Sequence, residues 1–65
     1  MKQTTIEALS SAFEQLQDLI GQLYTAAQVA LDNDDFSDAS LLQSRADRLY
    51  EEAEQLDVII SEMGG

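Results

Sequence analysis

Apolar residues recur with alternating spacings of three and four in two stretches of the chain, and this pattern constrains the fold most strongly. Such spacing places the apolar side chains along one side of an α-helix, at the a and d positions of a heptad repeat. The pattern covers about four heptads in each stretch, which is long enough to indicate coiled-coil pairing. The first set is Ile6, Leu9, Phe13, Leu16, Ile20, Leu23, Ala27 and Ala30, and the second is Ala39, Leu42, Ala46, Leu49, Ala53, Leu56, Ile60 and Met63.

These two sets, named the seam here, mirror each other about the middle of the chain. When the chain folds back at that point, every a residue of one stretch lies opposite a d residue of the other. Leu23 then meets Ala46, a large side chain against a small one, as close packing prefers. The layer of Leu16 and Ala53 is complementary in the same way. The sequence therefore predicts an all-α fold, an antiparallel two-helix hairpin that forms a single domain over residues 1–65.

Polar residues indicate where the first helix begins and ends. Thr4 and Glu7 have the spacing of a capping box, in which each side chain bonds the backbone amide of the other residue. The first helix is therefore expected over about 5–31. The Asp- and Asn-rich segment 32–37 suits a tight turn, because short polar side chains bond their own backbone.

The second helix is expected over about 38–62. Ser37 is its expected N-cap, because a serine hydroxyl can accept a hydrogen bond from a free amide of the first turn. Phe36 and Leu41 would then have the spacing of a hydrophobic staple. Two glycines follow the second helix and would end it.

The residue types present limit the chemistry that this chain can perform. The sequence contains neither Cys nor His, so disulfides, thiolate metal sites and His-based nucleophile pairs have no building blocks. The Asp-rich turn lacks the ligand spacing of a calcium loop. We therefore expect no enzyme activity, no catalytic residues, no cofactor and no metal. Because a chain of 65 residues rarely buries enough apolar surface alone, we expect a partner chain to add stability.

The charge is strongly negative, with 13 Asp and Glu against three Lys and Arg. Such a surface repels nucleic-acid phosphates and anionic lipids, so neither nucleic acid nor a membrane is an expected partner. The charge either confers solubility or matches a basic partner. No apolar run is long enough to span a bilayer and no secretory signal is recognisable, so a cytoplasmic location is expected. Export by a route without a signal remains open.

A second apolar stripe lies beside the seam, one position before the a residues. It widens the apolar surface beyond what one partner helix can cover, which is typical of a helical bundle. The ordinary alternative is scattered surface hydrophobes. We expect this Leu19–Ile59 flank to be an interface, either for a second copy in a four-helix bundle or for another protein. The residues of the flank are Ala12, Leu19, Ala26 and Ile59.

Three short segments carry a resemblance to a family of small helical hairpins: Thr5-Ile6-Glu7-x-Leu9, Leu42-Gln43-x-x-Ala46-x-x-Leu49 and Ile59-Ile60. They resemble the YscE-type co-chaperones of the type III secretion needle, which have about this length. The resemblance covers most of the chain by layout and few positions by identity. It implies that the hairpin docks on a larger chaperone and helps to shield a needle subunit.

A second pair of segments, Ala8-Leu9-x-x-Ala12 and Arg45-Ala46-Asp47-x-Leu49-Tyr50, is similar to Rop, an RNA-binding hairpin that dimerises into a four-helix bundle. Rop-type RNA binding uses basic and amide side chains of the first helix. Here that helix has acids at Glu7, Glu14 and Asp18, and Lys2 is the one base near it. The expected function is therefore protein binding, as a chaperone-like or inhibitor-like adaptor that sequesters a partner. RNA binding, or inhibition of a host factor by a phage or plasmid protein, is the alternative.

Overall fold

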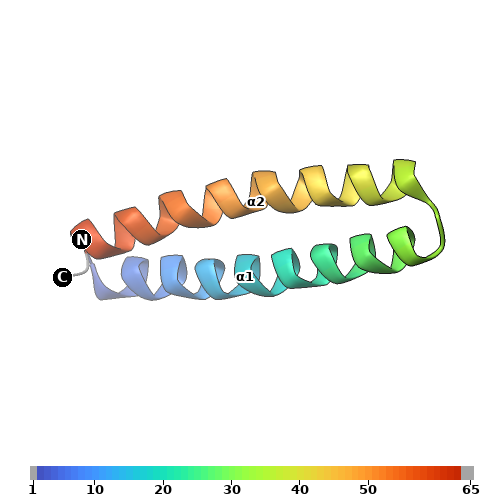
Figure 1. The fold of residues 1–65 in the computed structure, drawn as a ribbon. Coiled ribbons are helices and arrows are strands. Elements are labelled where there is room, and N and C mark those ends of the chain that lie inside the picture. Colours follow the sequence, from blue (N-terminus) through green and yellow to red (C-terminus); the bar gives the residue numbers. More distant parts are fainter. Residues whose placement is uncertain (1, 64–65) are drawn as a thin grey trace.

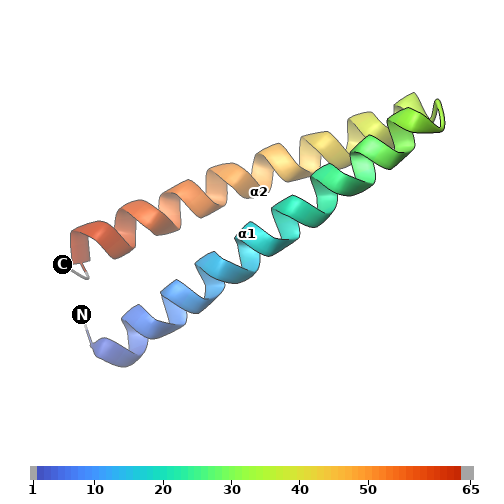
Figure 2. The same ribbon diagram turned by 60° about the horizontal axis from the view of Figure 1, so that its bottom comes forward.

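The computed structural model describes residues 2–63 and confirms the helical hairpin (Figure 1). Helix α1 (Gln3–Asp32) and helix α2 (Phe36–Met63) lie side by side in opposite directions, so the start of α1 and the end of α2 lie at the same end of the rod. Seen from a second direction, the helices are inclined to each other by a shallow angle (Figure 2). The Cα atoms span 48 × 14 × 12 Å, so the molecule is a rod two helices wide.

The buried residues of this rod all belong to the seam. They are Ile20, Ala27, Ala30, Ala39, Ala46 and Ala53. Five of the six are alanines, and no large side chain in residues 2–63 is fully enclosed. The remaining large seam residues are half-buried, except Met63: Ile6, Leu9, Phe13, Leu16, Leu23, Leu42, Leu49, Leu56 and Ile60. The hairpin therefore has a continuous but thin core.

Met63 is the one seam position that lies outside this core, with 55% of its surface exposed. It is the last residue of α2, so no further turn of that helix shields it. Its expected partner across the seam, Ile6, lies in the first turn and a half of α1, where the rod ends as well. The last layer of the seam at the open end is therefore only partly covered, with Ile6 half-buried and Met63 exposed.

Helix α1 begins earlier than expected and without a side-chain cap. Lys2 is its N-cap, in an extended conformation with φ −68° and ψ 148°. The Lys2 carbonyl accepts hydrogen bonds from the amides of Thr5 and Ile6, both at 3.1 Å. Thr4 therefore lies inside the helix, and the predicted capping box of Thr4 and Glu7 is wrong. Once a helix is nucleated, each added residue gains a hydrogen bond, so α1 extends past that capping sequence.

Helix α1 ends in a Schellman motif. The Asp35 amide donates to the Ala30 carbonyl at 2.8 Å. The Asp34 amide donates to the Leu31 carbonyl at 3.0 Å. These two bonds satisfy carbonyl groups that the helix end would leave free. Asp34 adopts the left-handed conformation that this motif requires, with φ 61°.

Helix α2 begins at Phe36, directly after this motif. The Asp35 carbonyl accepts a hydrogen bond from the Ala39 amide at 2.9 Å, as the carbonyl of an N-cap residue does. Ser37 therefore lies inside the helix, and its prediction as the N-cap is wrong. Phe36 and Leu41 are 65% and 62% exposed, so they do not form the predicted staple. Asp35 serves both helices, which shortens the turn to residues 33–35.

Replacing Asp34 by Gly is expected to stabilise the hairpin by about 1 kcal/mol, because Gly adopts the left-handed conformation without the steric cost that an L side chain meets. The change also removes a negative charge near the C-terminal end of α1, where the helix dipole disfavours it. For a domain of this size, such a gain raises the Tm by roughly 4–8 °C. Thermal unfolding followed by circular dichroism measures it.

Asp32→Gly is the matched control for this prediction. It removes the same charge two residues earlier, at the last helical residue of α1, where Gly lowers helix stability. We expect no increase in Tm for this variant. Equal increases for both variants would show that charge, and not the conformation of Asp34, limits stability at the turn.

Candidate interaction surfaces

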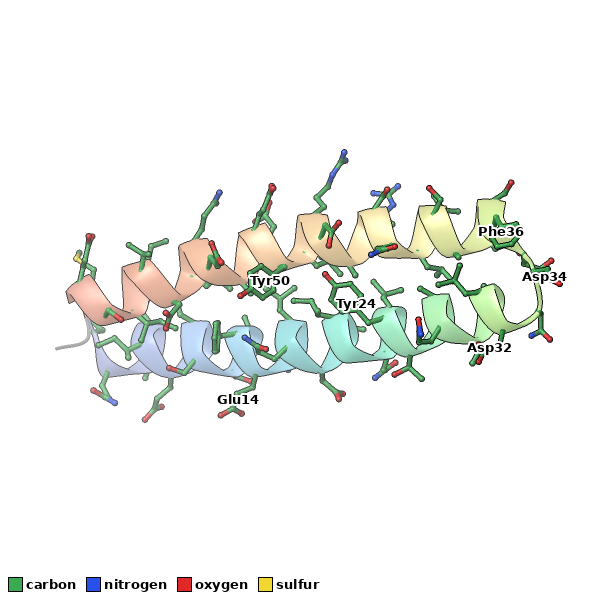
Figure 3. All side chains as sticks on the ribbon, in the orientation of Figure 1. Glu14, Tyr24, Asp32, Asp34, Phe36 and Tyr50 are labelled. Carbon is green, nitrogen blue, oxygen red and sulfur yellow. The ribbon has the colours of Figure 1, made fainter. Side chains whose placement is uncertain are left out.

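The hairpin has two flanks on either side of the seam. In an antiparallel pair of helices, the positions just before a share one flank, and the positions just after d share the other. Leu19 and Ile59 lie on the first flank by this rule, and Tyr24 and Tyr50 on the second. Figure 3 shows Tyr24 and Tyr50 on the same face, between the two helices. The two surfaces are named the Leu19–Ile59 flank and the Tyr24–Tyr50 flank below.

The residues predicted as an interface form a stripe along the Leu19–Ile59 flank. Leu19 is 47% exposed and Ile59 is 39% exposed, while Ala12 and Ala26 are half-buried. Residues that face each other across the seam have numbers that sum to about 69. Ile59 of α2 therefore lies opposite the part of α1 just before Ala12, which is about 13 Å along the rod from Leu19. The structure therefore places these four residues on one side of the hairpin and not in one compact cluster.

The burial of the seam itself differs between the two flanks. Five of the eight a residues are buried, whereas no leucine at a d position is. Around the circumference of a helix, the d position is adjacent to the heptad position that precedes a. The half-exposed leucines at d therefore face the Leu19–Ile59 flank. These leucines are Leu9, Leu16, Leu23, Leu42, Leu49 and Leu56. They enlarge the predicted interface, and sequence reasoning that treated a and d alike missed them.

Charge is also divided between the flanks. The part of α1 on the Leu19–Ile59 flank carries no charged residue. Its members are Thr5, Ala8, Ala12, Gln15, Leu19, Gln22, Ala26 and Val29. The heptad register places Arg45 and Arg48 on the same side of α2, where their charges are offset by those of Asp38, Glu52 and Glu62. One long side of the hairpin is therefore nearly neutral and apolar.

The Tyr24–Tyr50 flank is acidic. The positions on this flank and just outside it carry five carboxylates and no Lys or Arg within residues 2–63. They are Glu7, Glu14, Asp47, Glu54 and Asp57. Figure 3 shows Glu14 on the outer side of α1, away from α2. A surface of this kind favours cationic groups and repels anions.

Two grooves interrupt the Tyr24–Tyr50 flank. The first, of about 360 Å³, is lined by four apolar or aromatic residues and three polar ones: Phe13, Tyr50, Ala53, Val58, Gln17, Glu54 and Asp57. The second, of about 320 Å³, lies near the turn, and its lining is part apolar and part polar: Leu31, Phe36, Ala39, Ser40, Gln43, Ser44 and Asp47. Each groove lies beside an alanine at an a position, because a small side chain leaves space that the larger residues around it do not fill.

A hydrogen bond between the helices separates the two grooves. The Tyr24 hydroxyl donates to Oδ1 of Asp47 at 2.5 Å, level with Ala46, which has no exposed surface. This bond raises the pKa of Tyr24 above its ordinary value of 10.0, because the proton is held by the Asp47 carboxylate. Partial desolvation and the negative charge of Asp47 act in the same direction.

The Tyr24→Phe substitution is expected to lower the Tm near neutral pH, because it removes this link between the helices while keeping the ring. Folding raises the pKa of Tyr24 above its unfolded value of about 10.0, so the hydrogen bond stabilises the fold fully at pH values below 10.0. This stabilisation disappears as the pH rises through the pKa of the folded state. The difference in Tm between wild type and variant should therefore shrink in strong alkali.

Thermal unfolding at a series of pH values measures this difference. Tyr50→Phe is the matched control, because it also removes one hydroxyl from the same flank, and within residues 2–63 the Tyr50 hydroxyl makes no hydrogen bond to another side chain. A Tm difference for Tyr24→Phe that stays constant through the ionisation of tyrosine would contradict the assigned bond.

Residues 2–63 contain no group of three or more carboxylates that could hold a metal ion. In the same part of the chain, neither helix has a stretch both long and apolar enough to pass through a bilayer. Comparison with known proteins finds no matching family model, no matching curated protein and no matching solved structure.

Proposed function

We propose that this chain is a protein-binding hairpin that pairs with a second copy of itself. The two copies would pack through their Leu19–Ile59 flanks to form a four-helix bundle. In this form the protein acts as a chaperone-like or inhibitor-like adaptor that sequesters a partner protein in the cytoplasm. The observation that carries the proposal is the row of half-exposed d leucines beside an uncharged side of α1.

The total surface of the hairpin supports the need for a partner. It exposes 4776 Å², whereas a compact monomer of 7.2 kDa is expected to expose about 4,100 Å². The radius of gyration, 14.8 Å, likewise exceeds the value of about 11 Å for a compact chain of this length. The surplus surface is similar to the roughly 800 Å² that each partner buries in a standard interface.

Charge favours the Leu19–Ile59 flank over the opposite one as the place where two copies meet. Each copy carries a net charge of −10, so pairing must avoid bringing the carboxylates together. On the Leu19–Ile59 flank and just outside it, α1 contributes no charge, and α2 contributes two arginines beside three carboxylates, so opposite charges are mixed there. Pairing there buries apolar surface and leaves the acidic flank of each copy exposed to solvent.

The two resemblances described above, to Rop and to the needle co-chaperones, each support one part of the proposal. A bundle of two hairpins is the arrangement that the similarity to Rop implies, and docking on another protein is what the similarity to the needle co-chaperones implies. The acidic side of α1 disfavours RNA as the ligand, because each phosphate contact would need a cation that this side lacks.

A gel-shift experiment with single-stranded and duplex RNA at low salt separates protein binding from RNA binding. We expect no retarded RNA at micromolar protein, because low salt strengthens the repulsion between phosphates and carboxylates. In parallel, the immobilised protein should retain a basic protein from a nuclease-treated host lysate. Sub-micromolar affinity for RNA would contradict the proposal and would favour the Rop-like alternative.

A further inference from the structure

We propose that the Tyr24–Tyr50 flank binds a Lys- and Arg-rich amphipathic helix of a partner protein, with one apolar side chain of that helix seated in each of the two grooves. This proposal rests on the adaptor role above and assigns the chemistry of the partner. The flank combines two grooves, each with apolar residues in its lining, with nearby carboxylates and no Lys or Arg within residues 2–63, and each of these features restricts what can bind there.

The positions of the grooves fix the spacing of the apolar anchors. Ala53 lines the first groove and Ala39 lines the second, and both lie at a positions of α2. They are two heptads apart, which corresponds to about 21 Å along a helix. A third helix packed along the hairpin would repeat this spacing with apolar residues two heptads apart, the pattern of helix-in-groove recognition.

The acidic groups at the grooves select a basic segment. Glu54 and Asp57 line the first groove, and Asp47 lines the second. Tyr24 donates its hydrogen bond to Oδ1 of Asp47, so Oδ2 of the same carboxylate can accept one from a lysine or arginine. The exposed ring of Tyr50 offers a face on which a guanidinium or ammonium group can stack.

A second copy of the chain does not fit this flank. It carries 13 acidic residues and three basic ones, so its surface would place carboxylates against Glu54 and Asp57. A nucleic acid is disfavoured for the same reason. A cationic helix matches the two grooves and the carboxylates near them together, and salt should weaken its binding because the charged groups lie near solvent.

The direct test uses a fluorescent synthetic peptide of about three heptads, with two leucines two heptads apart, alanines elsewhere on that face and lysines at the flanking positions. Its control is the same peptide with glutamates in place of the lysines. Fluorescence anisotropy with wild-type protein should show binding of the lysine peptide at micromolar concentration and no binding of the glutamate peptide. Binding of neither peptide, or of both equally, would overturn the proposal.

Charge reversal in the protein locates the site. Glu54→Lys combined with Asp57→Lys should weaken binding of the lysine peptide by at least about tenfold, because two attractive contacts become repulsive. The matched control is Asp18→Lys combined with Glu51→Lys, which makes the same change in net charge at exposed outer positions of the two helices, away from both flanks. Equal weakening by both pairs would show that the peptide senses only overall charge, and would contradict the assigned site.

The same titration with Leu19→Asp separates this proposal from the pairing of two copies. The substitution lies on the opposite flank, so the peptide should bind with unchanged affinity. Loss of peptide binding in this variant would contradict a site confined to the Tyr24–Tyr50 flank. A wild-type protein that sediments as a monomer yet binds the lysine peptide would contradict the pairing alone.

Discussion

Replacing Leu19 by Asp is expected to separate the paired hairpins into folded monomers. Leu19 is 47% exposed in the single hairpin and lies in the middle of the flank where two copies are proposed to meet. Pairing of the variant would bury a carboxylate from each copy, at a cost of about 3 kcal/mol, which corresponds to roughly a hundredfold increase in Kd. Sedimentation equilibrium measures the change, and circular dichroism should show that helix content persists.

Val58→Asp is the control for this prediction. Val58 is an apolar α2 residue with similar exposure, 52%, and it lines a groove of the Tyr24–Tyr50 flank. The substitution adds the same charge to each copy outside the proposed interface. We expect its Kd for pairing to stay within a few-fold of wild type. A Kd that rises for Val58→Asp and not for Leu19→Asp would show that the hairpins meet through the acidic flank.

Replacing Ala46 by Asp is expected to unfold the hairpin. Ala46 has no exposed surface, so the new carboxylate would lie in the seam without a cation to pair with. An unpaired buried charge costs several kcal/mol, and a core of this size rarely supplies more than about 3–5 kcal/mol. Circular dichroism should show the loss of most helix content near neutral pH.

The control for this second prediction is Ser11→Asp, at an exposed position on the outer side of α1, away from both flanks. It adds the same negative charge without placing it in the seam. We expect a cooperative thermal transition close to that of wild type. A similar loss of structure in both variants would mean that net charge, and not burial at Ala46, determines the result.

The heptad pattern was sufficient to predict the hairpin. It identified the two helices, and the six residues that the structure buries all belong to its sixteen positions. Periodicity is informative here because, in a rod of two helices, each helix packs against the other along a single row of apolar residues. The segment rich in Asp and Asn marked the reversal, because the heptad repeat is interrupted between Ala30 and Ala39. The apolar residues of this segment, Leu31 and Phe36, do not belong to the repeat.

The details of the turn could not be predicted from capping residues alone. Ser37 is a good N-cap by residue type, but Asp35 accepts the first hydrogen bond of α2 and closes the Schellman motif of α1. That double role requires Asp34 to adopt a conformation that aspartate rarely takes. Residue preferences describe each helix end separately, whereas the short link between the helices determines both ends together.

The difference between the flanks was only partly accessible from the sequence. Six of the eight d positions are leucine, and four of the eight a positions are alanine, so the imbalance in size is visible in the chain. A difference in size becomes a groove or a protruding row only when the rotation of each helix about its axis is fixed. The grooves beside Ala39 and Ala53, and the bond between Tyr24 and Asp47, depend on that rotation.

The most direct test of the proposed pairing is sedimentation equilibrium of the purified wild-type chain over a range of micromolar concentrations, with circular dichroism at the same concentrations. Pairing through the Leu19–Ile59 flank predicts a folded species of twice the 7.2 kDa chain mass, which dissociates on dilution into single hairpins of 7.2 kDa that stay helical. A chain that remains fully helical at a mass of 7.2 kDa throughout would contradict it.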